Sequence, residues 1–351
     1  MSEIQNFLTK IRRRQPDFEN LLAVLRKESP SRPTLFEFFM NQGLYEFLAD
    51  EKAKNCNDEL RRFRVIISAF RNAGYDYVTI PASYSDILKF ERAGSAQKSS
   101  RSLNDGFVIT DAESFEKYPW PDSKSGHYDI FNTLAPLVPE GMKLVPSGPG
   151  GVLENAIDLV GYENLCYISM VDETLCKAVF DSIGSRLLDF YRRISSYDQV
   201  GAMIYNDDWG FKNQTMFSPE MLRSYVFPWC KKIVESVHAQ RKPVVLHSCG
   251  NLAEVMDDVI NDMNFDGKHS FEDNIVPVEE AYRKWGRQIA VMGGIDVDFL
   301  ATAKPETVRN RASALIEASS LQGSYALGSG NSIPDYIPIE NYFAMIEAVL
   351  E

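Results

Sequence analysis

The stretch PVVLHSCG, residues 243–250, joins a short apolar run to a polar end. A run of this length and composition is typical of a parallel strand that is covered on both faces. His247 and Cys249 stand two positions apart, and residues at this spacing point to the same face of a strand. The chain contains only four histidines and five cysteines. The pair therefore either packs in the core or holds a ligand.

The same pattern, a short apolar strand followed by a helical segment, repeats along the chain. Eight strands are expected, at residues 33–40, 75–81, 142–148, 200–210, 243–250, 265–273, 288–298 and 324–331. This alternation predicts an α/β fold, and eight repeats predict a (β/α)8 TIM barrel. An open doubly wound sheet is the alternative, but no glycine-rich phosphate-binding turn follows the first strand. Residues 164–170 are expected to add a further short extended piece.

Two regions fall outside this repeat. Residues 1–30 predict an N-terminal helical extension, and residues 31–351 form the expected barrel. Residues 83–135 break the rhythm, and the Asn-Asp-Gly sequence at 104–106 signals a hairpin. We interpret this region as an insertion, either a lid over the mouth of the barrel or a surface hairpin without such a role.

Composition limits the class of partner. The 351-residue chain has a net charge of −12, which argues against nucleic acids and anionic membranes as partners. No apolar run approaches the roughly 20 residues of a membrane span, and no apolar segment follows the basic N-terminal residues as in a signal peptide. A cytoplasmic location is therefore expected. The cysteines are odd in number and scattered, so no disulfide framework is expected.

Polar residues gather where the later strands end. In a barrel these ends share one rim, where active sites lie. The segments are Asn206-Asp207-Asp208-Trp209, His247-Ser248-Cys249, His269-Ser270-Phe271-Glu272-Asp273, Asp296-Val297-Asp298 and Ser329-Gly330-Asn331. Any one of them could instead cap the helix that follows.

Imidazole and thiolate are favoured zinc ligands, so His247 and Cys249 are candidate metal ligands. A packed thiol beside a hydrogen-bonded histidine is the alternative. Because no second pair matches them, an open catalytic site fits better than a structural one. His269 lies close to Glu272 in the sequence and is a candidate ligand, acid/base group or partner of a carboxylate.

Several motifs together resemble the uroporphyrinogen decarboxylase superfamily over about residues 30–351. They are NDDWG, SPEMLRSYVFPW, HSCGN, GGID and GSGNSIPDYIPIENY. The likeness is closer to the cobalamin-dependent methyltransferase branch. The resemblance implies a TIM barrel that moves methyl groups between small substrates and a corrinoid protein, with zinc in several members.

Three comparisons bear on the branch. The decarboxylases resemble one another in an arginine-rich motif after the first strand, whereas this chain has FEFFMNQGLYEFL there. The motif YSDIL, with Asp86, is similar to one in the decarboxylases and favours that reading. The zinc methyltransferases have Gly-Cys-Gly in the last strand, where this chain has Ser329 between two glycines. The third ligand is therefore lost, and Glu272, Asp207 or Asp208 are the candidates to replace it with oxygen.

The predicted function is methyl transfer from a small substrate, such as an aromatic methyl ether, to a corrinoid protein. Uroporphyrinogen decarboxylation and a non-catalytic barrel that binds a tetrapyrrole or corrinoid partner are the alternatives. A homodimer is compatible with the sequence. The expected groups are Asp207, Asp208, Glu272 and His269 for catalysis, Trp209, Asn206, Ser329, Asn331 and Asp296 for substrate binding, His247 and Cys249 for zinc, and Trp209, Phe271 and Tyr336 for an apolar wall.

Overall fold

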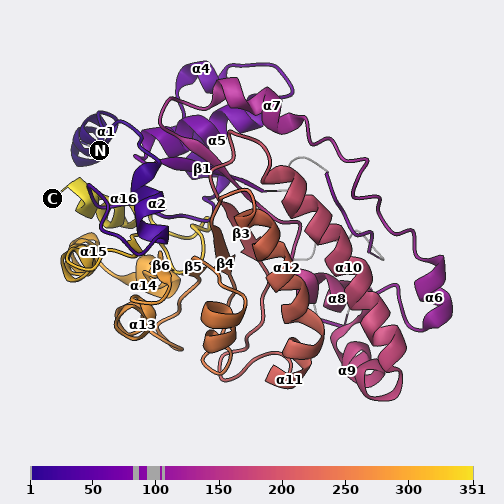
Figure 1. The fold of residues 1–351 in the computed structure, drawn as a ribbon. Helices are drawn as coiled ribbons and strands as arrows, with labels where there is room; N and C mark the ends of the chain where they lie inside the picture. The colour runs from indigo at the N-terminus through magenta and orange to yellow at the C-terminus, as the bar shows by residue number, and fades with distance from the viewer. Residues whose placement is uncertain (1, 82–86, 93–102, 105–106, 351) are drawn as a thin grey trace.

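In a computed structural model, residues 2–81, 87–92, 103–104 and 107–350 are described (Figure 1). Within these residues one curled sheet contains seven strands, all parallel and in the order β1 to β7. The strands are β1 (Tyr77–Pro81), β2 (Lys143–Ser147), β3 (Met203–Asn206), β4 (Val244–His247), β5 (Gly267–His269), β6 (Ala290–Met292) and β7 (Tyr325–Ala326). The predicted α/β fold is confirmed, with a parallel sheet of the kind found in TIM barrels.

Helices surround the sheet, and some extend well beyond it (Figure 1). They are α1 (Ser2–Ile11), α2 (Glu19–Leu25), α3 (Gln42–Leu48), α4 (Glu51–Lys54), α5 (Arg61–Asn72), α6 (Ala112–Lys117), α7 (Ile130–Leu134), α8 (Val152–Val160), α9 (Tyr162–Val171), α10 (Glu173–Ile194), α11 (Pro219–Met221), α12 (Phe227–His238), α13 (Val278–Trp285), α14 (Val297–Thr302), α15 (Pro305–Ser319) and α16 (Ile339–Glu347). The extended piece expected at 164–170 is wrong, because these residues belong to α9. Short apolar runs do not distinguish a strand from a buried helix.

The first predicted strand, residues 33–40, is not a regular strand. It makes two isolated parallel bridges, Leu35 with Leu327 and Met40 with Ile333. On its other side, the hydroxyl of Tyr77 in β1 accepts from the Glu37 N–H at 2.6 Å and donates to the Glu37 carbonyl at 2.8 Å. A tyrosine side chain thus takes the place of ladder bonds between this segment and β1. Residues 33–40, expected as one of eight strands, therefore form a bridging segment rather than a regular strand.

The start of the chain covers the end of the sheet at which the strands begin. An added side chain at Gly201, just before β3, would meet the Phe18 ring at 2.4 Å, and one at Gly267 would meet Leu25 of α2 at 2.9 Å. Helix α1 lies beside α16 near the C-terminus (Figure 1). There the ring centroids of Phe7 and Phe343 are 5.5 Å apart.

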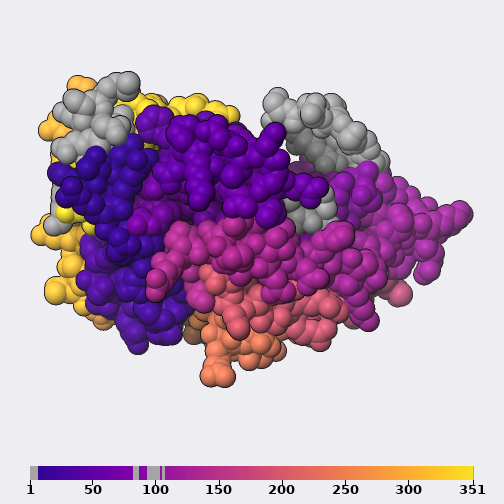
Figure 2. Space-filling model, turned by 90° about the horizontal axis from the view of Figure 1, so that it is seen from above, coloured from indigo at the N-terminus to yellow at the C-terminus, as the bar shows by residue number. Residues whose placement is uncertain are grey.

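The region between β1 and β2 is described in part. The hairpin predicted around Asn104-Asp105-Gly106 and the candidate Asp86 lie largely or wholly outside the described residues. Next to them, the N–H groups of Val108 and Ile109 both donate to the Leu159 carbonyl at 2.8 Å, near the end of α8. The magenta residues that follow form a projecting end of the molecule in Figure 2. A role for this region as a lid stays a prediction. No helix of the described residues is long and apolar enough to cross a membrane.

A buried carboxylate fastens the N-terminal segment to the sheet. Asp76, only 1% exposed in its side chain, accepts a hydrogen bond from the Asp17 N–H at 2.9 Å and one from Arg32 at 2.5 Å. The Arg14 guanidinium lies 3.7 Å from its other oxygen. We expect Asp76→Ala to lower the free energy of unfolding by about 3 kcal/mol or more, because it leaves the buried Arg14 and the partly buried Arg32 without their partner. Urea unfolding measures this.

Glu19→Gln is the matched control for this variant. Glu19 pairs with Arg26 at 3.5 Å, and both side chains are largely exposed. Exposed ion pairs contribute little to stability, so the control should unfold like the wild type. Equal stability of Asp76→Ala and Glu19→Gln would contradict the role given to Asp76.

A second ion pair, at the start of β4, makes stability depend on pH. His238 Nε2 lies 2.7 Å from Asp266, and this hydrogen bond raises the pKa of His238. A raised pKa in the folded state stabilises the protein below the unfolded pKa of about 6.5, and the contribution is lost as pH rises through the folded value. We therefore expect His238→Gln to be less stable than wild type at pH 5.5 and equally stable at pH 8.5. A difference in urea unfolding that is the same at both pH values would refute this.

Candidate active site

The register of three neighbouring strands brings polar side chains to one level. Asn206 pairs with His247 across β3 and β4, and His247 pairs with His269 across β4 and β5. Residues level with one another on parallel strands point to the same side of a sheet. The three side chains therefore share the inner face of the curled sheet, at the carboxyl ends of the strands.

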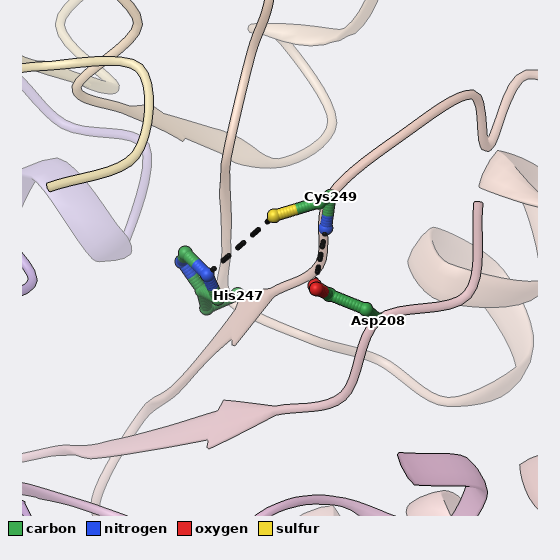
Figure 3. Close-up of side chains that lie close together, drawn as sticks. All are labelled: Asp208, His247 and Cys249. Atoms are coloured by element: carbon green, nitrogen blue, oxygen red, sulfur yellow. Dashed lines mark hydrogen bonds between the residues drawn. The ribbon is translucent and has the colours of Figure 1, made fainter. Parts of the chain in front are cut away.

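Asp208, His247 and Cys249 meet just beyond these strand ends (Figure 3). One potential ligand atom of each residue lies within 4.8 Å of those of the other two. Cys249 Sγ is 3.9 Å from His247 Nε2, and Asp208 Oδ1 accepts a hydrogen bond from the Cys249 N–H at 2.8 Å. His247 is buried, whereas Asp208 and Cys249 are partly exposed. The structure thus joins the two predicted zinc ligands with one of the three carboxylates that were candidates for the third.

The two histidines are coupled to each other. His247 Nδ1 lies 2.8 Å from His269 Nδ1, and His269 Nε2 lies 3.1 Å from the Ser329 carbonyl oxygen. Burial lowers the pKa of His247 well below its usual value and that of His269 to about 3. Both imidazoles are therefore neutral at neutral pH. His269 lies behind His247. Among the described residues, its ring forms a hydrogen bond to His247 but to neither Asp208 nor Cys249.

Aromatic rings that sequence reasoning passed over enclose the histidines. The Phe38 ring centroid lies 4.3 Å from that of His247, and the Phe36 centroid lies 5.1 Å from that of His269. Both phenylalanines belong to the FEFF sequence of the bridging segment. The alternation of this apolar segment could have indicated them, but only the closure of the sheet places them against β4 and β5.

Burial also governs the thiol of Cys249. Burial, with the nearby Asp208, raises the pKa of Cys249 far above its usual value. Asn331 Nδ2 donates to Cys249 Sγ at 3.2 Å. Cys249 is therefore a protonated thiol when no metal is bound, and Asn331 is placed to stabilise its thiolate form. Asn331, predicted to bind substrate, contacts the candidate ligand instead.

Ser329 does not turn its hydroxyl toward the cluster. Its Oγ donates to Glu37 Oε1 at 2.5 Å, and its N–H donates to Glu37 Oε2 at 3.2 Å. Burial raises the pKa of Glu37 to about 8. The hydroxyl of Ser329 is thus engaged by a buried carboxyl group that sequence reasoning did not single out, and its contact with substrate stays a prediction.

Asp207 contacts the start of a helix rather than the mouth of the fold. Its two oxygens accept the N–H groups of Leu153 and Glu154, at 3.0 and 2.8 Å, in the first turn of α8. The Tyr205 hydroxyl also donates to it at 2.9 Å. Burial raises the pKa of Asp207 to about 6 despite these bonds. Both oxygens thus fix the N-terminus of α8, and a catalytic role for Asp207 stays a prediction.

Two other predicted contacts are structural for similar reasons. Asp296 caps α14 by accepting the Phe299 N–H at 2.9 Å, and its other oxygen accepts the Asp273 N–H at 2.9 Å. Trp209 is fully buried, with its ring 5.1 Å from that of Phe227 in α12. Both side chains thus have structural contacts, and their binding of substrate stays a prediction.

The remaining predicted residues divide by exposure. Glu272 is partly buried, and its Oε1 lies 3.4 Å from the N–H of Gly250, next to the cluster. Asn206 Oδ1 is buried and has no hydrogen-bond partner among the described residues. Phe271 is buried under the Lys268 ammonium, 4.6 Å from its ring, whereas Tyr336 is 65% exposed. Glu272 and Asn206 remain candidates for contact with substrate, but an apolar wall made by Phe271 and Tyr336 is not supported.

The rim is acidic. The described segments that follow β2 to β7 hold the carboxyl groups of Asp207, Asp208, Glu272, Asp273 and Asp296, and their only lysine or arginine is the exposed Lys212. The nearest buried cation, Lys268 in β5, donates to the Ser248 carbonyl at 2.9 Å and to that of Ser270. Burial lowers the pKa of Lys268 to about 8. Carboxyl groups therefore outnumber cationic groups in these described segments.

A family model described as uroporphyrinogen decarboxylase (URO-D) matches residues 19–351. The chain belongs to the URO-D family. This confirms the resemblance identified from the sequence motifs. Among curated proteins no sequence matches the chain.

One solved structure is similar over nearly the whole chain. A methyltransferase from Methanosarcina mazei is similar with a TM-score of 0.74 and 17% identity, over 95% of this chain and 98% of that chain. A GH27 β-L-arabinopyranosidase from Geobacillus stearothermophilus gives a TM-score of only 0.40 and 12% identity, over 93% of this chain and 78% of that chain. The first similarity establishes a shared fold, and the second is too weak to support an argument.

The two adjacent aspartates should behave differently on substitution. Asp207→Ala leaves two N–H groups of α8 and the Tyr205 hydroxyl without their buried acceptor. We expect a loss of about 2–3 kcal/mol in the free energy of unfolding. Asp208→Asn keeps an oxygen that can accept from the Cys249 N–H, so its stability should stay near that of the wild type. Urea unfolding of both variants tests the assignment, and a larger loss for Asp208→Asn would reverse it.

Proposed function

We propose that this protein is a methyltransferase that moves a methyl group from a small methylated substrate, such as an aromatic methyl ether, to a corrinoid carried by a partner protein. We propose further that Asp208, His247 and Cys249 hold a zinc ion at its active site. The observation that carries the proposal is the convergence of these three donors at the carboxyl end of the sheet, where the active sites of barrel enzymes lie.

The donor set fits zinc. Carboxylate oxygen, imidazole nitrogen and thiolate sulfur bind zinc at about 2.0–2.3 Å, and catalytic sites use three protein ligands with a fourth position open. Ligand atoms around a tetrahedral zinc are therefore roughly 3.5 Å apart. The three donors already lie within 4.8 Å of one another, so small side-chain movements are enough. When bound, zinc would act as a Lewis acid toward the substrate oxygen or nitrogen that carries the methyl group.

The chain's own residues supply the surroundings of this reaction. The Phe36 and Phe38 rings exclude water from the side of the histidines. The unpartnered Oδ1 of Asn206 on the same inner face is placed to accept a hydrogen bond from substrate. Glu272, beside the Gly250 N–H, is the candidate acid that protonates the leaving oxygen. A neutral substrate suits an acidic rim better than a polyanion does.

Uroporphyrinogen decarboxylation is the second candidate. Membership of the URO-D family and the YSDIL motif with Asp86 favour it. The described rim opposes it, because a substrate with many carboxylates would face the carboxyl groups of Asp208 and Glu272, and the exposed Lys212 is the only lysine or arginine in the described segments after β2 to β7. Like charges brought together without partners are costly.

The proposal is tested by methyl transfer. With reduced corrinoid proteins from the same genome and a panel of methoxylated aromatics and methylamines, we expect formation of methyl-Co(III), seen as a change in cobalt absorbance. Cys249→Ala should lower the rate at least about 100-fold, which corresponds to several kcal/mol of lost transition-state stabilisation. Cys56→Ala is the matched control, because Cys56 lies outside the site and bonds only to the Lys52 carbonyl among the described residues.

The alternatives predict other outcomes. Conversion of uroporphyrinogen to coproporphyrinogen at enzymatic rates would assign the protein to decarboxylation. Absence of both methyl-Co(III) and bound zinc, in protein that binds a tetrapyrrole or a corrinoid protein, would support the non-catalytic barrel.

A further inference from the structure

Behind the proposed zinc ligand His247, a line of hydrogen bonds crosses the inner face of the sheet from β4 to the bridging segment. His247 contacts His269, His269 contacts the Ser329 carbonyl, and Ser329 contacts Glu37. Every member is buried. Since water does not compete for these groups, each hydrogen bond fixes which atom carries a proton.

The positions of the protons follow from the last acceptor. A carbonyl oxygen can only accept, so the His269 Nε2 that faces Ser329 must carry a hydrogen. A neutral imidazole carries one N–H, so His269 Nδ1 has a free lone pair. His247 Nδ1, 2.8 Å away, must then be the donor. This leaves His247 Nε2 without a hydrogen, and it is this nitrogen that lies 3.9 Å from Cys249 Sγ.

Burial favours the neutral form of both rings. Neither His247 nor His269 forms an ion pair with a carboxylate of the described residues. The buried ammonium of Lys268, next to His269 in β5, further opposes a second positive charge there. With both rings uncharged, only one arrangement of the protons satisfies both hydrogen bonds.

We infer that His269 is a positioning residue that holds His247 in the Nδ1–H tautomer and so presents the bare Nε2 to a metal at Asp208 and Cys249. This inference rests on the proposed metal site and deepens it. Hydrogen bonds from the second ring nitrogen of a ligand histidine orient the ring and set its tautomer. Here a neutral imidazole provides that bond.

The rest of the line holds His269 in place. Ser329 is fixed from two sides, since both its hydroxyl and its N–H donate to Glu37. Glu37 is in turn fixed by the Tyr77 hydroxyl, which bonds to both its N–H and its carbonyl. The Ser329 carbonyl is therefore a rigid acceptor. This explains why a serine at this position serves the site without reaching the metal.

The tautomers can be observed in the metal-free protein. The chain has only four histidines, so long-range ¹⁵N–¹H correlation spectra can resolve each imidazole. We expect His247 to carry its hydrogen on Nδ1 and His269 on Nε2. A wild-type spectrum with the His247 hydrogen on Nε2 overturns the inference, whether or not the protein binds zinc or transfers methyl groups.

Substitution of His269 then links the tautomer to metal binding. Leu and Asn have nearly the same shape, but only Asn can accept a hydrogen bond from His247 Nδ1. We expect His269→Leu to shift the His247 hydrogen to Nε2 and to weaken zinc binding by roughly 10- to 100-fold in competition with a chelating dye. His269→Asn should retain the Nδ1–H form and restore most of the affinity.

Met292→Leu is the packing control, because Met292 is a fully buried residue of the neighbouring strand β6. It should bind zinc as the wild type does. Unchanged affinity in His269→Leu, or an equal loss in the Leu and Asn variants, overturns the positioning role. If the wild type itself binds no zinc, the proposed metal site fails, and the spectra still decide the tautomer.

Discussion

Parallel pairing of β3, β4 and β5 is the constraint on which the site depends. Its register sets Asn206, His247 and His269 side by side on the inner face. A slip of one residue would turn His247 outward and bring its apolar neighbour Leu246 inward, because side chains alternate along a strand. The buried ladder thus does two things at once, since it packs the sheet and aims the imidazoles.

The carboxyl groups at the strand ends have separate tasks. Asp207 and Asp296 fix the first turns of α8 and α14, and Asp273 pairs with Arg311 of α15 at 2.7 Å. These bonds hold the loops in which Asp208 and Glu272 lie. An acidic rim is therefore mostly a set of supports for the helices, and only a minority of its carboxyl groups is left for ligands.

Burial without counter-charges gives the site its character. The imidazoles of His247 and His269 stay neutral, the Cys249 thiol keeps its proton, and burial raises the pKa of Glu37 to about 8. These four buried groups therefore add little charge to the site. A divalent cation would change this balance, because it favours loss of the thiol proton. Burial and a bound cation would thus have opposite effects on the protonation of the Cys249 thiol.

The sequence by itself determined the alternation of strands and helices, the family and the pairing of His247 with Cys249, because these follow from local periodicity and from spacing along one strand. It could not decide which carboxylate joins them, since Asp207 and Asp208 are neighbours and only the position of α8 separates their roles. It also missed Glu37 and Phe38. These residues reach the site only when the bridging segment closes against β7 and β1, a contact between opposite ends of the chain that tertiary structure alone decides.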